Sequence, residues 1–369
     1  MELDEYTERL REQVKKYKGF INAHTHLDRA GTLDKKYLGH VGMDPIVASS
    51  YPLEVKRNLV GDLHRGIAYT KDNLEERIRK YLDLMIFFDT REVISFIDTT
   101  ADEVGLSALE IALKLGEEYK AKINLKLSAY PTFGFKVDEP ERWEIYVEAA
   151  KRVDILGGIP DRDDKKEHPR SVGYDEHIRK ILKLGIELRK EVHVHVDQNN
   201  KENENGTETL IEAVRWLGQP IEREEPSVWA IHSISPSCYE EKRFNSLVEK
   251  LVRYNIGVIC CPSAALSMRQ LRPIKTPTHN SIARILEMLE KGVEIRIGSD
   301  NIADVFVPSG TPNLYKELYL LTNAIRFYPD NILAKIACGI ALTDMDRHLI
   351  HQSLEQDRGA WRKINPDYN

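Results

Sequence analysis

Long apolar runs are absent from this sequence of 369 residues. No window approaches the roughly 18 uninterrupted apolar residues that a membrane-spanning helix needs. Residues 1–19, MELDEYTERLREQVKKYKG, are amphipathic and highly charged, and they lack the continuous apolar core of a secretion signal. We therefore expect a cytoplasmic protein that does not insert into a membrane.

An excess of basic charge is absent as well. The chain has 53 Lys and Arg against 59 Asp and Glu, a net charge of −6, so no basic face for nucleic acid is expected. The HxE and PCxxC signature of the zinc deaminases that act on nucleic acids is also missing. These absences leave a small molecule as the expected substrate.

Cysteine is scarce, with four residues at Cys238, Cys260, Cys261 and Cys338. None of them has the CxxC spacing of a structural zinc site, and adjacent cysteines rarely bridge each other. A reducing compartment fits this usage. We expect Cys260 and Cys261 to be small buried residues and not thiolate ligands.

Phosphate-binding glycine loops are the last notable absence. Neither GxGxxG nor GxxxxGK follows any apolar run, which disfavours a doubly wound nucleotide-binding sheet. The sequence does contain eight short apolar, β-branched runs, separated by segments with the i, i+3, i+4 spacing of amphipathic helices. The runs cover residues 19–26, 93–101, 123–132, 153–160, 191–198, 227–235, 256–264 and 293–301.

Eight alternations of strand and helix predict an α/β protein with the fold of a (β/α)8 TIM barrel. Among the helical patterns, residues 72–88 have Asp72 or Asn73 as the expected N-cap, and residues 279–292 close on Gly292.

The domain organisation that we predict is a single barrel over residues 1–369. Residues 29–70 are too many for an ordinary βα loop, and long excursions of this kind often act as lids or shape the substrate site. Residues 343–369 follow the last barrel helix and are expected to form a helical C-terminal extension.

Histidine and aspartate residues collect at the ends of the predicted strands, on the face where barrel enzymes carry their chemistry. His24 and His26 lie two residues apart on the first run, so both side chains leave the same side of the pleat. His195, His232 and Asp300 end the fifth, sixth and eighth runs. Imidazoles with one carboxylate suit zinc or iron. Any one of these residues alone could be a polar strand end, but their joint position favours a metal site.

The motifs HTHLDR, HVDQ, AIHSIS and GSDN, in this order, resemble those of the amidohydrolase superfamily, and in particular its cytosine deaminase-like members. The resemblance covers most of the chain. It implies that His24, His26, His195 and Asp300 bind the metal and that His232 contacts the metal-bound water or the reacting group. Binuclear members carry a carbamylated lysine at the end of the fourth strand, where DILGGIP has none. One divalent ion, Zn²⁺ or Fe²⁺, is therefore implied.

Two residues depart from the cytosine deaminase pattern. Gln198 stands where those enzymes carry a glutamate as proton shuttle, and Thr132 stands where they carry a cytosine-binding glutamine. Because an amide cannot shuttle that proton, cytosine itself is not favoured as the substrate. The accessory β-sandwich common in the family is also not expected, since both ends of this chain have helical patterns.

These residues predict hydrolysis of a C–N bond in a small cyclic nitrogenous compound, such as a pyrimidine- or triazine-like ring, by a metal-activated water. The predicted catalytic residues are Asp300, His232 and Gln198. An apolar wall over the ring is expected from Phe133, Phe135 and the excursion. The predicted substrate-binding residues are Thr132, Asp161, Asp197 and Asn301, with Asp304 as a further one.

Two alternatives stay open on the sequence. A cyclic amide, lactone or ester hydrolase would use the same mononuclear site and would tolerate Gln198 in place of a glutamate. A non-catalytic binding homologue is the other alternative, and the retention of every expected metal ligand argues against it. The resemblance alone suggests a homo-oligomer.

Overall fold

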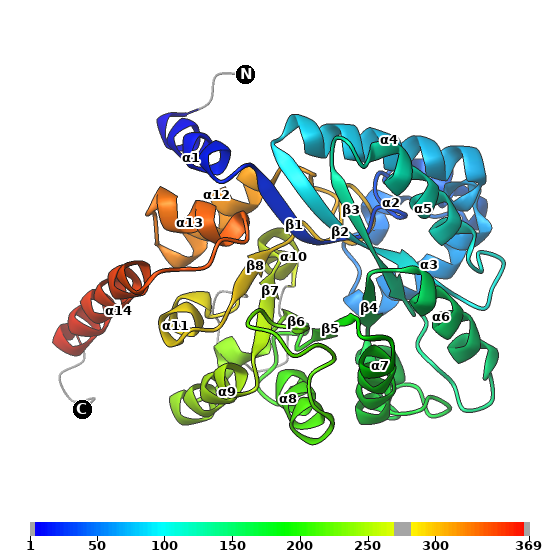
Figure 1. Ribbon diagram of the computed structural model, residues 1–369. Coiled ribbons are helices and arrows are strands. Elements are labelled where there is room, and N and C mark those ends of the chain that lie inside the picture. The colour runs from blue at the N-terminus through cyan, green and yellow to red at the C-terminus, as the bar shows by residue number, and fades with distance from the viewer. Residues whose placement is uncertain (1–3, 269–281, 365–369) are drawn as a thin grey trace.

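The computed structural model describes residues 4–268 and 282–364. Eight parallel strands hydrogen-bond in sequence order and form a barrel with helices outside it, as predicted (Figure 1). Each strand overlaps its predicted run. The strands are β1 Phe20–Thr25, β2 Thr90–Asp98, β3 Asn124–Tyr130, β4 Ile155–Gly158, β5 Glu191–Val196, β6 Val228–His232, β7 Ile256–Cys260 and β8 Ile295–Ile297.

The barrel closes between β1 and β8. The Asp300 backbone nitrogen donates to the His24 carbonyl at 2.9 Å. Asn22 Nδ2 donates to Ser299 Oγ at 2.8 Å, and Ser299 N donates to Asn22 Oδ1 at 3.0 Å. Gly298 permits this approach, because a Cβ atom there would lie 2.9 Å from the His24 backbone nitrogen. The closure brings His24 and Asp300 side by side.

Helices cover the outside of the barrel (Figure 1). The helix α11 ends on Gly292, whose φ is 98°, as predicted, and the first residues of the predicted segment 279–292 lie outside the described part of the chain. The main barrel helices are α4 Lys71–Phe87, α5 Ser107–Tyr119, α6 Glu141–Arg152, α7 Tyr174–Leu188, α8 Gly206–Leu217, α9 Glu241–Arg253, α11 Ile285–Lys291 and α12 Leu314–Ile325.

The predicted N-cap of α4 is wrong. Thr70 precedes the helix and makes no side-chain capping bond, and Asp72 lies in the first turn. Asn73 is inside the helix, where its side chain accepts a hydrogen bond from Arg77 Nε at 2.9 Å. The apolar pattern therefore located the helix but not its first residue.

Strand side chains are almost continuously buried, because the strands face helices on one side and the packed barrel interior on the other. Every residue of β1, β6 and β7 is buried. Cys260 and Cys261 are both 1% exposed and are free thiols, as expected. Apolar packing fills the barrel, so chemistry is left to the residues at its rim.

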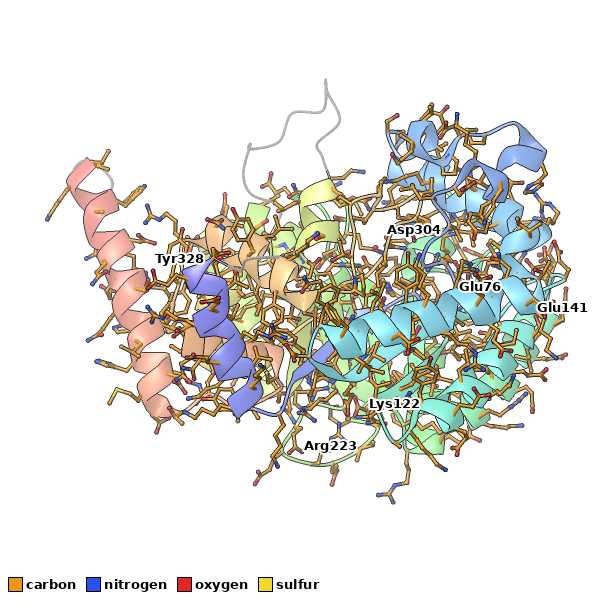
Figure 2. All side chains as sticks on the ribbon, turned by 90° about the horizontal axis from the view of Figure 1, so that it is seen from above. Glu76, Lys122, Glu141, Arg223, Asp304 and Tyr328 are labelled. Carbon is orange, nitrogen blue, oxygen red and sulfur yellow. The ribbon has the colours of Figure 1, made fainter. Side chains whose placement is uncertain are left out.

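The excursion at residues 29–70 folds into short helices at the C-terminal rim of the barrel. Figure 2 shows it toward the side of Asp304, which follows β8, whereas Lys122 and Arg223, which precede β3 and β6, lie at the opposite side. Its elements are η1 Lys35–Tyr37, η2 Gly39–Val41, α2 Pro45–Ala48, α3 Leu53–Arg65 and η3 Ile67–Tyr69.

His64 and Tyr69 fix this excursion to the end of β2. His64 Nε2 lies 3.1 Å from Asp98 Oδ2, and His64 Nδ1 lies 2.6 Å from Asp102 Oδ2. The Tyr69 hydroxyl donates to Asp98 Oδ2 at 2.9 Å. Burial by itself lowers the pKa of His64, but its hydrogen bonds to Asp102 and Asp98 outweigh burial and raise the pKa to about 9. An imidazolium bridging two carboxylates therefore holds α3 on the barrel.

Helices also occupy both ends of the described chain. At one end α1 Glu5–Lys16 lies beside α13 Asp330–Ala337, and at the other α14 Asp344–Ile364 packs on α11 (Figure 1). Every named strand in residues 4–268 and 282–364 belongs to the barrel sheet, in keeping with the expected lack of a β-sandwich. Over the same residues, no helix combines the length and apolar character needed to cross a membrane.

Candidate metal centre and its pocket

Four side chains from the ends of β1, β5 and β8 meet in one buried cluster. His24 Nε2 lies 3.1 Å from His195 Nε2 and 3.3 Å from Asp300 Oδ1. His26 Nε2 lies 3.4 Å from the same carboxylate oxygen. The largest exposed fraction among the four residues is 5%, at Asp300. The structure therefore brings together the four residues that the sequence predicts as metal ligands.

The donor atoms of this cluster fit a divalent metal ion. His195 Nδ1 lies 2.9 Å from the Gly158 carbonyl oxygen, which can only accept. The ring proton of His195 is therefore on Nδ1, and the lone pair of Nε2 points toward His24. The ligand atoms of His24, His26 and Asp300 lie within 4.8 Å of one another. Imidazole nitrogens with one carboxylate suit zinc or iron better than magnesium or calcium.

Arg29 contacts the other nitrogen of His26. Its Nη2 atom lies 2.5 Å from His26 Nδ1. A guanidinium only donates, so in this arrangement Nδ1 accepts and the proton of a neutral His26 is on Nε2, toward Asp300. A metal bound at Nε2 needs the opposite tautomer. An ion held by Nε2 would therefore compete with the contact between Arg29 and Nδ1.

Burial keeps His26, His195 and His232 neutral by lowering their pKa values. It lowers the pKa of His26 to about 3 and that of His232 to about 4, and it holds the pKa of His195 well below its usual value. Burial alone would raise the pKa of Asp300, but hydrogen bonds with His24 and His26 outweigh it and hold that pKa well below its usual range. Neutral imidazoles beside an ionised carboxylate are the forms that bind metal.

His232 and Asp300 leave their strands with left-handed backbone, at φ values of 75° and 55°. Residues other than glycine rarely adopt this conformation, and such strain concentrates at functional sites. His232 Nε2 lies 3.8 Å from Asp300 Oδ2, the carboxylate oxygen that is not shared with His24 and His26. His232 is thus placed to act on a group held beside this oxygen.

A pocket lies beside the cluster. Its lining includes Thr132, Gln198 and Asn301, as the sequence predicts, together with His26, His195, His232 and Asp300. Asn301 Nδ2 donates to Asp304 Oδ2 at 2.6 Å, so its carbonyl oxygen is left for a ligand. Asp304 also accepts from two backbone nitrogens and therefore shapes the loop after β8. The apolar lining includes Leu53 and Val60 of α3, Tyr130, Ile159, Ala264, Phe306 and Val307.

Asp161 does not line the pocket, but its carboxylate accepts hydrogen bonds from two residues that do, Gln198 and Arg57. It belongs to η4 Pro160–Asp163, and its Oδ2 atom accepts from Gln198 Nε2 at 3.1 Å and from Arg57 Nη2 at 3.0 Å. Because only the amide nitrogen can donate to a carboxylate, the carbonyl oxygen of Gln198 is left for the pocket. Asp161 therefore orients Gln198 and does not itself face a ligand.

The prediction that Asp197 faces the substrate is wrong. Its φ of 54° breaks the strand alternation after His195 and turns the side chain toward the start of α8. There it accepts from the backbone nitrogens of Gly206 and Thr207 at 2.6 and 2.8 Å, and from Thr207 Oγ1 at 2.5 Å. Asp197 caps a helix, and Gln198 reaches the pocket instead.

The prediction that Phe133 and Phe135 form an apolar wall of the pocket is also wrong. Phe135 is 1% exposed and stacks on His177 with ring centroids 4.9 Å apart. Phe133 packs against His64 at 5.3 Å between centroids and is not among the residues lining this pocket. Aromatic rings at the pocket come instead from Tyr130 and Phe306. The contribution of the excursion is as expected, and its movement as a lid stays a prediction.

Sequence reasoning missed three cations in the pocket wall, Arg29, Lys56 and Arg57. Arg29 lies three residues after His26, a spacing that could have drawn attention to it. Lys56 and Arg57 belong to α3, and the sequence has no signal for which face of this helix meets the barrel. Their exposed fractions are 7% and 6%, which is unusual for these residue types.

Comparisons with known proteins agree with the fold. No model of a known protein family matches the chain. It is 29% identical over 281 residues to an uncharacterized protein of Haemophilus influenzae, covering 76% of this chain and 94% of that one. It is 22% identical over 327 residues to the N-isopropylammelide isopropyl amidohydrolase of a Pseudomonas species, covering 86% of this chain and 71% of that one.

Among solved structures, the 5-methylcytosine deaminase of Klebsiella pneumoniae liganded with 5-fluorocytosine matches with a TM-score of 0.72 and 21% identity, covering 86% of this chain and 72% of that one. The atrazine chlorohydrolase of Arthrobacter aurescens, complexed with zinc, matches with a TM-score of 0.53 and 16% identity, covering 89% and 68%.

The similarity to these solved structures agrees with the eight-stranded barrel, and the buried His and Asp cluster lies at the rim of that barrel. The chain is thus similar to an amidohydrolase and to a deaminase, the kinds of protein that its motifs resemble.

Proposed function

We propose that the chain hydrolyses a C–N bond in a pyrimidine- or triazine-like ring, releasing ammonia or an amine, with one Zn²⁺ or Fe²⁺ ion held by His24, His26, His195 and Asp300. The observation that carries the proposal is the buried cluster of these side chains next to a pocket that ends on the Gln198 amide. The similarity to an N-isopropylammelide isopropyl amidohydrolase and to a 5-methylcytosine deaminase supports a ring substrate.

The ion, when bound, would lower the pKa of a water molecule toward neutrality and so supply the nucleophile. The residues of the chain handle the protons. Asp300 Oδ2, which His24 and His26 leave unshared, accepts the proton of the attacking water and passes it to the leaving nitrogen. Neutral His232, 3.8 Å from this oxygen, stabilises the negative charge that develops on the reacting group.

Gln198 orients the ring. Its carbonyl oxygen accepts from a ring N–H group, because Asp161 engages its amide nitrogen at 3.1 Å. Thr132 and Asn301 supply further hydrogen-bonding groups on the pocket wall. Since Gln198 cannot carry a proton, Asp300 must perform both proton transfers. We therefore propose a substrate other than cytosine, whose ring needs no separate carboxylate shuttle.

The same lack of a glutamate supports a second candidate function. Opening of a cyclic amide, or hydrolysis of a lactone or ester, requires the nucleophile and the Asp300 proton transfer but no protonation of an aromatic ring nitrogen. Gln198 would serve either reaction as a hydrogen-bonding group. The products distinguish the two, because only the first reaction releases ammonia or an amine.

The test is a product screen with the zinc-loaded and the iron-loaded full chain. Aminopyrimidines, aminotriazines, cyclic amides and lactones are incubated with the enzyme, and ammonia, amine and ring-opened products are quantified. Ammonia or amine from a ring, abolished in Asp300→Asn, supports the first function. A ring-opened product without ammonia supports the second function, hydrolysis of a cyclic amide, lactone or ester. The absence of product from every compound would contradict both functions.

A further inference from the structure

The pocket wall carries more positive charge than its carboxylates balance. Arg29, Lys56 and Arg57 all line it, and none is more than 7% exposed. Among the lining residues that the structure describes, Asp300 is the only carboxylate, and it belongs to the metal cluster. Buried cations need a compensating charge or strong hydrogen bonds, so the partners of each side chain decide how much of its charge is left for a ligand.

Among the three cations, Arg57 is the one whose positive charge is balanced by carboxylates. Its Nη2 atom lies 3.0 Å from Asp161 Oδ2, and its Nη1 atom lies 2.5 Å from Glu54 Oε1. With a carboxylate at each side of the guanidinium, its charge is balanced within the protein.

Among the described residues, Lys56 forms no ion pair with a carboxylate, although the charge of Asp304 lies near enough to act on it. Its Nζ atom donates to the Phe306 carbonyl at 3.0 Å and lies 3.4 Å from the Ser49 carbonyl. Carbonyl dipoles solvate an ammonium only in part, and burial lowers the pKa of Lys56. An ammonium has three donors, so one is left for a ligand.

Burial by itself lowers the pKa of Arg29, but the nearby buried carboxylates of Asp98 and Asp28 raise it, although Arg29 makes no hydrogen bond to either among the described residues. Its nearest carboxylate contact is from Nε to Asp98 Oδ2 at 4.0 Å, longer than a hydrogen bond, and Nε has no hydrogen-bond partner among the described residues. Its guanidinium lies over the Phe306 ring, 5.4 Å from the centroid, which holds it at the pocket wall. Its Nη2 atom lies 2.5 Å from His26 Nδ1, and a guanidinium has further donors that are left for a ligand.

We infer that the pocket selects a ring that carries a negative charge, with Lys56 and Arg29 as the residues that recognise the anionic group. The inference rests on the proposed function for the ring and adds the charge of the substrate. The anionic group is either an exocyclic carboxylate or a ring oxygen that has lost its proton, and both offer oxygen acceptors to an ammonium and a guanidinium. Lys56 and Arg29 are thus specificity-determining residues.

A structural role for Lys56 is the competing explanation, because its contact with the Phe306 carbonyl ties the excursion to the loop after β8. The two roles differ in what they change. Loss of a structural tie lowers thermal stability and weakens the binding of every ring alike. Loss of a recognition residue weakens the binding of anionic rings only.

The test is calorimetric binding to the zinc-loaded full chain with three probes: uracil as the neutral ring, orotate as its carboxylate, and barbiturate as a ring oxyanion. Wild type is expected to bind an anionic probe about tenfold or more tightly than uracil at low salt. Lys56→Met should lose this preference, with a much larger loss of affinity for the anionic probes than for uracil. Lys56→Arg should retain the preference, and Lys35→Met, at a lysine of the excursion that is 81% exposed, serves as the matched control.

The results separate the inference from the proposed function. Preference for orotate alone identifies the carboxylate, and preference for barbiturate alone identifies the ring oxyanion. Anion-selective binding without any C–N hydrolysis would sustain the inference and remove the proposed reaction. Hydrolysis of neutral rings without a preference for anions would support the proposed reaction and overturn the inference. Equal affinity for all probes, no binding of any probe, or an equal loss for all probes in Lys56→Met would overturn the inference.

Discussion

The amide nitrogen of Gln198 lies 3.1 Å from Asp161 Oδ2, and this hydrogen bond fixes which end of the amide meets a ligand. Asp161 is itself paired with Arg57 at 3.0 Å, so the orientation of Gln198 depends on an ion pair between η4 and the excursion. The residue that replaces the glutamate of cytosine deaminases is therefore held as an acceptor.

Replacing Gln198 with Glu should move activity toward pyrimidine-type deamination. The new carboxyl group would lie beside Asp161, and repulsion between two carboxylates raises the pKa of one of them, which suits a proton shuttle near neutral pH. The measurement is kcat/KM for cytosine and for the ring found in the product screen. The Asp161→Asn variant keeps Gln198 and serves as control. An unchanged substrate profile in Gln198→Glu would count against a role of this position in proton transfer.

Replacing Asp300 with Asn should remove turnover while the barrel stays folded. The amide keeps the size of the side chain but cannot accept and return a proton, so we expect kcat to fall on the order of 10⁴-fold. Circular dichroism and thermal melting check the fold, and metal analysis reports any loss of ligand. Normal turnover in Asp300→Asn would remove this residue as the proposed base.

Replacing Asp197 with Ala should destabilise the protein without removing metal. The change deletes the acceptor for two backbone nitrogens at the start of α8 and leaves an alanine at a φ of 54°. We expect a loss of about 1–3 kcal/mol in the free energy of unfolding, measured by urea denaturation. Asp197→Asn, which tolerates this backbone and retains an acceptor, should lose less. Equal stability of Asp197→Ala and wild type would contradict the capping role.

His64 should make stability depend on pH in the alkaline range. Its pKa is raised to about 9 in the folded protein from an unfolded value of about 6.5, so the folded state holds the proton more tightly. The stabilisation is fully present below about pH 6.5 and is lost as pH rises through about 9, about 3 kcal/mol in all. Urea denaturation from pH 6 to 10 should show this decline in wild type.

The His64→Gln variant should lack that part of the decline, because glutamine does not titrate. His40→Gln, at an exposed histidine of the same excursion, should retain it. Parallel pH profiles for wild type and His64→Gln would mean that the contacts with Asp98 and Asp102 do not involve an imidazolium.

The barrel could be predicted from the sequence because buried parallel strands are apolar over their whole length. All eight runs became strands in order, and the polar residues ending them met at one rim. His24 and His26 are an example, since two residues of spacing on a strand fixes the shared direction of their side chains. That inference needs only local geometry.

The wrong predictions concern residues whose position depends on tertiary contacts and not on the spacing within one strand. Asp197 was expected to face the substrate, but the left-handed turn at this residue directs its side chain to the start of α8. Lys56 was missed for a different reason, because a short amphipathic helix in an excursion has no fixed neighbour until the chain is folded. Phe135 was assigned to the pocket by its position after β3, whereas the packing of α6 and α7 draws it into the core.

The central claim is that His24, His26, His195 and Asp300 hold one metal ion, and elemental analysis of protein purified without chelator tests it most directly. The account predicts about one zinc or iron per wild-type chain and none in His195→Ala. His193→Gln, which alters a buried histidine that contacts Glu191 at 3.0 Å, should keep the metal. A metal-free wild type, or His195→Ala with a full complement of metal, would contradict the account.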